Sequence, residues 1–204
     1  MAKNNCYKEL LNPFNAVNVI SKESEKTDSR DTLTNSMIGS LLMAFATMVS
    51  ANLMLSFPVE SGFITSQQVS YLTFVTTPLG FLMLLFFYTA MFYAGVFILY
   101  RLSIFFGSKG NFKKLSYTFS LFHVLIGSGA IAALLFATIP LLNLLVPVLV
   151  LFGALYVFYL QYVGLRTVHK ELSRMRAVAV YLVSMVVYAV AQYGVYAIIS
   201  GIII

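Results

Sequence analysis

Five long apolar runs, none of which contains an aspartate or a glutamate, restrict the fold of this chain more than any other feature of its sequence. A helix needs about 20 mostly apolar residues to cross a hydrocarbon core of about 30 Å, and each run is long enough. The only basic residue inside them is Arg101, near the end of one run, where its long side chain can carry the charge to the interface. The runs predict five transmembrane helices, over about residues 36–57, 79–106, 116–138, 143–165 and 177–203.

The composition excludes a water-soluble domain. Hydrophobic residues make up 60% of the 204 residues and charged residues only 10%, with a mean hydropathy of +0.88, whereas soluble domains carry about 25% charged residues. Membrane spans are helices or closed barrels, and a barrel would show alternating polarity in segments of about ten residues. We therefore expect an all-α polytopic membrane protein, with an N-terminal segment over residues 1–35 and one helical bundle over residues 36–204.

Lysines and arginines predict the orientation. All 13 lie in three places: the N-terminal segment, the end of the second span with the loop after it, and the loop after the fourth span. The connections 58–78 and 139–142 and the C-terminus have none. The three basic places fall on one side of a five-span chain, and by the positive-inside rule that side is the cytoplasm. We expect the N-terminus in the cytoplasm and the C-terminus outside.

The N-terminal segment contains one candidate amphipathic helix. Asn12 can cap a helix that has Pro13 at its first position, where a missing N–H costs nothing. Phe14, Val17 and Ile20 would then share an apolar face. Such a helix either lies on the inner membrane surface or packs under the bundle, and the sequence leaves both open.

The rest of this segment predicts little structure. Residues 21–32 are polar and mixed in charge, as in a hydrated linker. Cys6 is the only cysteine, which rules out an internal disulfide. The first 35 residues contain no apolar core long enough for a secretory signal, so we expect the N-terminus to be retained.

A few polar side chains lie inside the spans, where ionisable groups are costly and often functional. His123 lies about 10 Å into the third span at 1.5 Å per residue. Matching depths predict one hydrogen-bonded cluster in the cytoplasmic half, formed by Tyr93, His123, Tyr159, Gln161 and Ser184. Two roles for His123 stay open: a neutral imidazole that fixes helix packing, and a contact to a lipid headgroup or a transported solute.

Small residues recur at four-residue spacing, as in Gly129, Ala133 and Ala137 of the third span and Ala90 and Ala94 of the second. Such faces let helix backbones approach one another in lipid. We expect these faces to pack within the chain or between copies in a homo-oligomer.

No set of catalytic or metal-binding residues stands out. There is no nucleophile with a base at interpretable spacing, no pair of carboxylates and no phosphate-binding glycine loop, so we expect neither an enzyme nor a cofactor. His169 is predicted in a surface loop without a ligand cluster, which argues against a metal site. Coupled cation carriers use buried acids and the spans contain none, but a passive pore stays open.

The cytoplasmic connections carry eight basic residues, counting Arg101, against Glu171 alone. These charges either serve only to set the topology or also bind anionic lipid headgroups or partner proteins. We expect no nucleic-acid partner, because the charges lie in short loops close to a membrane. The seven candidate contact residues are Lys109, Lys113, Lys114, Arg166, Lys170, Arg174 and Arg176.

Three stretches resemble the Yip-type domain family. In QYVGLRTVHKELSRMRAVAVYLV, residues 161–183, Gly164 precedes a Val-His pair, and the basic-Ala pair Arg176–Ala177 opens the last span. The stretch LNPF at residues 11–14 is similar to the family's N-terminal element, and NFKKLSY at residues 111–117 to its entry into the third span.

This resemblance, over about residues 9–190, implies a five-span integral membrane protein. Eukaryotic members of the family act in vesicle trafficking and interact with Rab GTPases and with one another. This chain has only about 35 residues before its first span, and Phe122-His123 where a proline is usual. These departures argue against GTPase binding and favour the prokaryotic branch, in the plasma membrane of a prokaryote.

The sequence therefore favours a non-enzymatic membrane scaffold that organises lipids or other membrane proteins through its bundle and its basic face. The alternative is a small transporter or channel that uses the polar cluster around His123.

Overall fold

All five predicted spans are helices in the computed structural model, which describes residues 2–25, 28–56, 66–139, 142 and 144–203. Each of the five is long and apolar enough to cross a membrane. They are α3 (Ser29–Leu55), α5 (Pro78–Phe105), α6 (Phe112–Ala137), α8 (Val146–Val168) and α9 (Arg174–Ile203). Three shorter helices accompany them: α1 (Ala2–Leu10), α2 (Pro13–Glu23) and α4 (Ser66–Val75). Within the described ranges all regular structure is helical, which confirms the all-α, five-span prediction.

The helix α3 begins at Ser29, seven residues before the predicted span, so part of the predicted linker is helical. The Asp28 side chain caps this helix by accepting a hydrogen bond of 2.8 Å from the Arg30 N–H. Thr32 and Asn35 are polar, yet both are buried. Hydropathy alone does not recognise a helical turn whose polar side chains pack against a neighbouring helix. It therefore locates the apolar part of α3 but not the start of the helix.

Two other spans begin at polar residues that supply caps. The Thr77 side chain accepts from the Gly80 N–H at 3.0 Å, and Pro78 takes the first helical position of α5. The Asn111 side chain accepts from the Lys113 N–H at 2.8 Å at the start of α6. Both caps satisfy N–H groups that have no partner within the helix.

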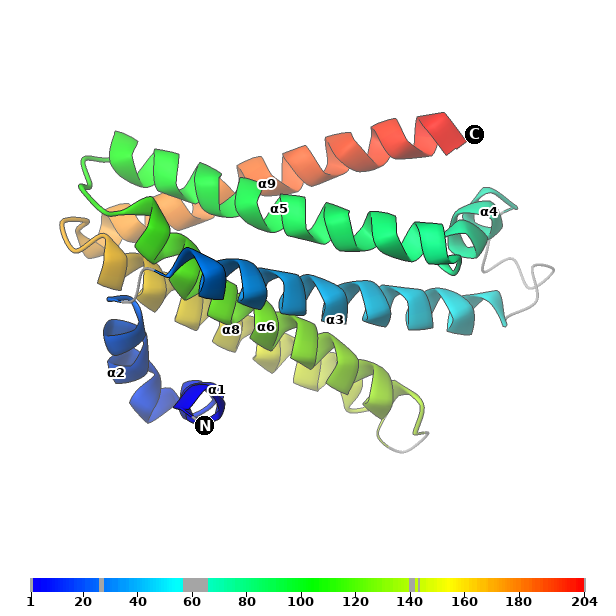
Figure 1. The fold of residues 1–204 in the computed structure, drawn as a ribbon, viewed down its shortest axis with the longest axis horizontal. Coiled ribbons are helices and arrows are strands. Elements are labelled where there is room, and N and C mark those ends of the chain that lie inside the picture. Colours follow the sequence, from blue (N-terminus) through cyan, green and yellow to red (C-terminus); the bar gives the residue numbers. More distant parts are fainter. Residues whose placement is uncertain (1, 26–27, 57–65, 140–141, 143, 204) are drawn as a thin grey trace.

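Among the spans, α3 packs against α5 and α6, α5 packs against α9, and α6 packs against α8, while smaller contacts of α5 with α6 and of α8 with α9 close the bundle. The helices α6 and α8 are neighbours, as the short connection between them requires. Figure 1 shows that the spans converge where the connections 106–111 and 169–173 lie, and that α9 and α6 separate toward the other end. We call the converging end the basic end, because eight of the 13 lysines and arginines lie in these connections and at the helix ends beside them.

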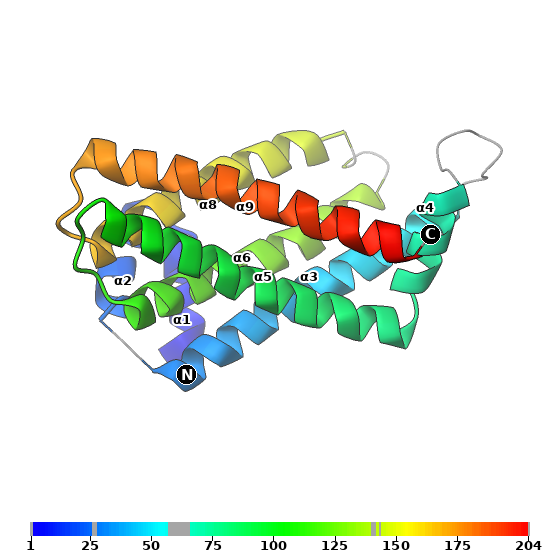
Figure 2. The same ribbon diagram turned by 90° about the horizontal axis from the view of Figure 1, so that it is seen from above.

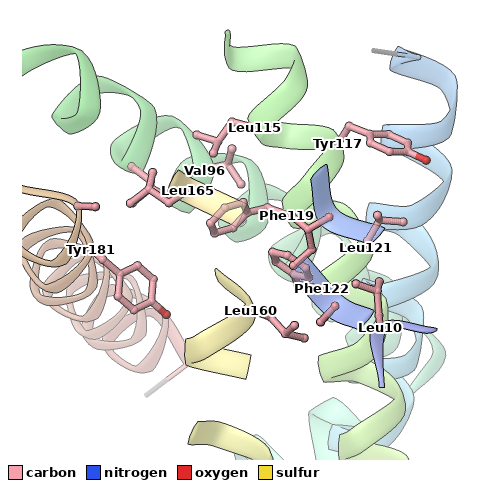
Figure 3. Close-up of a cluster of buried hydrophobic side chains, with 14 of the residues drawn as sticks. Leu10, Val96, Leu115, Tyr117, Phe119, Leu121, Phe122, Leu160, Leu165 and Tyr181 are labelled. Atoms are coloured by element: carbon pink, nitrogen blue, oxygen red, sulfur yellow. The ribbon is translucent and has the colours of Figure 1, made fainter. Parts of the chain in front are cut away.

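The largest group of buried side chains lies in the converging half of the bundle (Figure 3). Leu115, Phe119 and Phe122 of α6 are its centre, with Leu165 of α8 and Val96 of α5 around them. Many side chains near the other end of α8, by contrast, are exposed. The basic end is therefore the best-packed part of the protein.

The N-terminal helix packs under the bundle, the second of the two arrangements that the sequence left open. Ala16, Val19, Ile20 and Glu23 of α2 are buried, while Val17 is exposed. The predicted face was therefore wrong for Val17, and the side chain of Phe14 lies outside the described part of the chain. The buried residues follow the helical spacing i, i+3, i+4, i+7, so α2 is amphipathic with a different face from the one predicted.

Close helix packing occurs at glycines other than the predicted ones. A Cβ added to Gly39 of α3 would lie 2.5 Å from Cδ2 of His123, and one added to Gly127 of α6 would lie 2.8 Å from the Gly39 carbonyl oxygen. A Cβ added to Gly129 would meet nothing within 4 Å, and Ala90 and Ala94 are exposed. The predicted small-residue faces therefore do not make the close contacts within the chain.

Candidate functional site

Two regions hold the functional residues predicted from the sequence: the interior of the spans and the basic end. In the interior, His123 of α6 and Tyr93 of α5 both face α3. His123 Nε2 lies 3.0 Å from the Ser40 hydroxyl, and the Ser36 hydroxyl donates to the Tyr93 oxygen at 3.3 Å. The imidazole also stacks obliquely on Phe92, with ring centroids 4.9 Å apart.

The other three predicted residues are hydrogen-bonded or stacked elsewhere. Gln161 of α8 accepts a hydrogen bond from the Tyr181 hydroxyl of α9, and the Ser184 hydroxyl donates to the Tyr181 carbonyl oxygen at 2.7 Å. Tyr159 is exposed and its ring stacks on Tyr156. The five residues thus form two hydrogen-bonded groups and one surface tyrosine. The prediction of a single cluster rested on matching depth along the spans. Depth alone does not determine which side of a helix a residue occupies, and so it does not determine the residue's neighbours.

The residues that sequence reasoning missed are on α3. Asn35, Ser36 and Ser40 all face neighbouring helices, and the Asn35 amide donates to the Ser120 hydroxyl at 3.4 Å. The Tyr7 hydroxyl of α1 donates to the Asn35 side-chain oxygen at 3.3 Å, which connects the N-terminal helices to the interior. The four-residue spacing of Ser36 and Ser40, which puts both on one face of a helix, is a signal that could have found them.

The interior group is packed rather than open. The ring of His123 fills the space left by the missing side chain of Gly39. Its hydrogen-bonding partner is a neutral hydroxyl, which suits a neutral imidazole. Across the described ranges, no group of three or more His, Cys, Asp or Glu side chains could hold a metal ion.

At the basic end, His169 is fully buried, so its predicted place in a surface loop was wrong. Its Nδ1 lies 2.6 Å from the Ser108 hydroxyl, which joins the α8–α9 connection to the α5–α6 connection. The Ser108 hydroxyl donates to a Glu171 carboxylate oxygen at 3.3 Å and accepts from the Gly110 N–H at 3.1 Å. A Cβ on Gly110 would lie 2.2 Å from His169 Nδ1, so the imidazole takes the place of a side chain there.

These contacts determine the protonation of the group. The single Ser108 proton can go to Glu171 while Nδ1–H of His169 donates to the Ser108 oxygen, which matches a buried Nε2 that has no hydrogen-bond partner in the described part of the chain. Burial lowers the pKa of His169 to about 4, so the imidazole is neutral at pH 7. Its own backbone N–H and the hydrogen bonds from Lys109 and Ser108 hold the pKa of Glu171 below its ordinary value.

This arrangement does not resemble a catalytic triad. In a triad the carboxylate contacts the imidazole, and the imidazole contacts an accessible nucleophile. Here the carboxylate of Glu171 contacts Ser108, whose side chain is buried. The geometry instead suits a structural role, in which these hydrogen bonds hold the α5–α6 and α8–α9 connections together.

The residues that carried the family resemblance meet in this region. A Cβ on Gly164 would lie 2.8 Å from the Phe122 ring and 3.0 Å from the Thr118 methyl group, so glycine lets α8 approach α6. His169 and Ala177 are both fully buried. The motif therefore consists of packing positions at the basic end.

The predicted contact residues surround this end. Five of them are exposed, namely Lys109, Lys113, Lys170, Arg174 and Arg176, while Lys114 and Arg166 are half-buried. From residue 101 to residue 176 the chain holds eight basic residues and one acid, a net charge of +7, whereas residues 1–35 hold five basic and five acidic residues. Positive charge is thus concentrated on the two connections and the helix ends beside them rather than on the N-terminal helices.

Comparison with known proteins gave one family. The model of the Yip1 domain matches residues 9–196, which is most of the chain. No curated protein and no solved structure matched the chain.

Proposed function

The chain belongs to the Yip1 domain family, and on that premise we propose that it is a non-enzymatic integral membrane protein that organises its membrane through lipid and protein contacts. The basic end would make these contacts from the cytoplasmic side, with the N-terminus on the same side and the C-terminus across the membrane. The observation that carries the proposal is the concentration of a net charge of +7 on the two connections of the best-packed end and the helix ends beside them, within residues 101–176.

Anionic lipid headgroups are the first partners that this charge fits. Lys113 and Lys114 lie in the first turn of α6, and Arg166 lies in the last turn of α8, where spanning helices reach the interface. The Nε of Arg166 is buried and has no hydrogen-bond partner in the described part of the chain. Each basic residue near an anionic surface contributes about 1 kcal/mol, so three together would enrich anionic lipid around the bundle.

Lipid selectivity tests this part of the proposal. The chain is reconstituted in phosphatidylcholine with a trace of spin-labelled phosphatidylglycerol or spin-labelled phosphatidylcholine, and the motionally restricted fraction is measured by electron paramagnetic resonance. We expect the anionic label to be preferred and the preference to disappear on combined Lys113→Glu, Lys114→Glu and Arg166→Glu substitution. Reversal of the exposed Lys8 and Lys22 is the matched control. Equal selectivity in the triple variant and the control would remove the lipid contact from the proposal.

We place the protein in the plasma membrane of a prokaryote, in the prokaryotic branch of the family. The departure from the family pattern at Phe122-His123, where a proline is usual, supports this placement. The same departure argues against GTPase binding. Detection of the tagged protein in the inner-membrane fraction of its host would test the placement.

The second candidate function is a small transporter or channel that uses His123. Its support is the polar line that Asn35, Ser36 and Ser40 of α3 form beside His123 and Tyr93. The close packing of the imidazole on Gly39 favours a structural role instead. Solute flux into proteoliposomes that is lost on His123→Ala, in a variant that stays folded, would favour transport over the scaffold.

A further inference from the structure

Two large apolar side chains are almost fully exposed at the basic end. Phe105, the last residue of α5, is 83% exposed, and Met175, in the first turn of α9, is 81% exposed. Figure 2 shows that the last turn of α5 and the first turn of α9 lie at the same end of the molecule. Exposed apolar residues are ordinary on the lipid-facing side of a span, so the question is whether these two lie inside the bilayer.

The register of the helices places Phe105 outside the hydrocarbon. The Ser36–Tyr93 hydrogen bond aligns α3 with α5. Phe105 lies twelve residues beyond Tyr93, about 18 Å along the helix, whereas Ser29 lies only about 10 Å before Ser36, at 1.5 Å per residue. The end of α5 therefore extends past the first turn of α3, as Figure 1 also shows. That turn is flanked by Asp28 and holds charged residues that require water.

The charge around this surface indicates which kind of partner would bind it. Phe105 and Met175 lie within residues 101–176, which hold eight basic residues and one acid, Glu171, while Asp28 and Asp31 lie at the start of α3. A second copy would bring the same net positive charge and be repelled. The bilayer of the protein itself lies below the level of Phe105. A protein segment with acidic and apolar side chains complements both features of the surface.

We propose that Phe105, Met175 and the neighbouring basic residues Arg174 and Arg176 form a docking surface for an acidic amphipathic helix of a partner protein. This inference rests on the proposed function, since it names the class of protein that the basic end would bind. It also divides the basic residues in two: those in the terminal turns of α6 and α8 face lipid, and those beside Phe105 and Met175 face a protein.

The chain contains no tryptophan, so one substitution gives a site-specific fluorescent reporter. Phe105→Trp and Met175→Trp are compared with Phe86→Trp, whose position in the middle of α5 is 73% exposed to the lipid side. The full chain is placed in phosphatidylcholine nanodiscs. We expect acrylamide in water to quench the first two reporters and brominated lipid to quench only the third. Quenching of the first two by brominated lipid would overturn the proposal, because the bilayer would then cover the surface.

The probe is a synthetic amphipathic helix of glutamate and leucine, and its matched control contains lysine in place of glutamate. We expect the acidic helix to shift the emission of the reporters at positions 105 and 175 to shorter wavelength and to protect them from acrylamide. Combined Arg174→Glu and Arg176→Glu substitution should weaken this binding by about tenfold or more, equivalent to about 1.4 kcal/mol or more. No response to the acidic helix, an equal response to the basic helix, or a shift caused by more protein alone would each overturn the proposal.

Failure here is distinguishable from failure of the proposed function. Lipid selectivity depends on Lys113, Lys114 and Arg166, which none of these variants changes. A chain that keeps its lipid selectivity but ignores the acidic helix would retain the proposed function and lose only the docking surface.

Discussion

The hydroxyl of Tyr117 on α6 donates a hydrogen bond of 2.9 Å to the carboxylate of Glu23, the last residue of α2. Both side chains are buried, so an acid from the N-terminal segment is held inside the protein by a residue of a membrane span. The N-terminal helices are further attached by Tyr156 of α8, which donates to the Leu10 carbonyl oxygen. These contacts make α1 and α2 part of the bundle.

Tyr117→Phe should therefore loosen α2 without unfolding the spans. The variant removes one hydrogen bond from a buried carboxylate, which costs about 1–3 kcal/mol. Hydrogen exchange of the α2 amides should accelerate, while exchange in α6 beyond Gly127 stays unchanged. Tyr193→Phe is the control, because that side chain is 75% exposed. Unchanged exchange of α2 in Tyr117→Phe would show that the hydrogen bond does not hold this helix.

Gly39→Ala should destabilise the protein, and Gly129→Ala should not. In a helix interior, alanine is normally favoured over glycine by about 0.5–1 kcal/mol. A Cβ at Gly39, however, would lie 2.8 Å from the backbone carbonyl of His123 as well as 2.5 Å from its ring, and a backbone cannot rotate away. Overpacking of this kind costs about 1–3 kcal/mol and outweighs the helix preference.

Thermal unfolding in detergent checks the sign of both changes. We expect a lower midpoint for Gly39→Ala and an equal or higher midpoint for Gly129→Ala, whose added Cβ meets nothing within 4 Å. A stable Gly39→Ala variant would mean that α3 and α6 can move apart without loss.

The sequence was sufficient for the number and approximate place of the spans, because hydropathy depends only on composition along the chain. Prediction from the sequence failed for features that depend on tertiary contacts. The first turns of α3 are polar in sequence but buried in the fold, and α4 arises in a connection that hydropathy reads only as too polar to cross. The close contact at Gly39 depends on which helices are neighbours, which no spacing rule within one helix reveals.

The candidate site was predictable to a similar degree. The residues of the basic end follow directly from the charges in the sequence. Burial of His169 could not be inferred, because it requires Ser108 and Gly110 from a loop about 60 residues earlier in the chain. Gly164 and Ala177 were noticed through the family resemblance, and their packing roles became visible only in the fold.

Acidification should weaken the hydrogen-bonded contact of Ser108 with His169 and Glu171 at the basic end. The pKa of His169 is about 4 in the folded protein, lowered from its ordinary value of 6.5 by burial. Between these values the unfolded chain binds more protons than the folded one, so folding stability falls as the pH drops from 6.5 toward 4, by at most about 3 kcal/mol. The lowered pKa of Glu171 acts in the same direction at lower pH.

His169→Gln isolates this contribution, since it removes the titrating group and keeps a polar side chain. Unfolding midpoints measured from pH 7 to pH 4 should fall more steeply for the wild type than for the variant. His123 is present in both proteins, so its contribution cancels, whereas the interaction of Glu171 with His169 is part of the measured difference. Parallel curves would show that His169 is not buried as a neutral imidazole.

Cysteine labelling should place the two ends of the bundle on opposite sides of the membrane. In a Cys6→Ser background, Lys109→Cys and Ser173→Cys report on the basic end, and Ser56→Cys and Thr138→Cys on the other; all four positions are exposed.

Among the described helices, α1, α2 and α4 have 9, 11 and 10 residues. At 1.5 Å per residue each covers only about 14–17 Å, too little for a hydrocarbon core of about 30 Å. Among the described helices, only the five long ones can therefore cross, and five is an odd number.

Because positive residues near a span are retained in the cytoplasm, an impermeant maleimide added to intact cells should label positions 56 and 138 and leave 109 and 173 unlabelled until the membrane is opened. The opposite pattern would keep the five spans and reverse the orientation. Labelling of all four positions from outside would contradict the five-span bundle itself, since no arrangement of α3 and α6 as crossing helices puts both of their ends on one side.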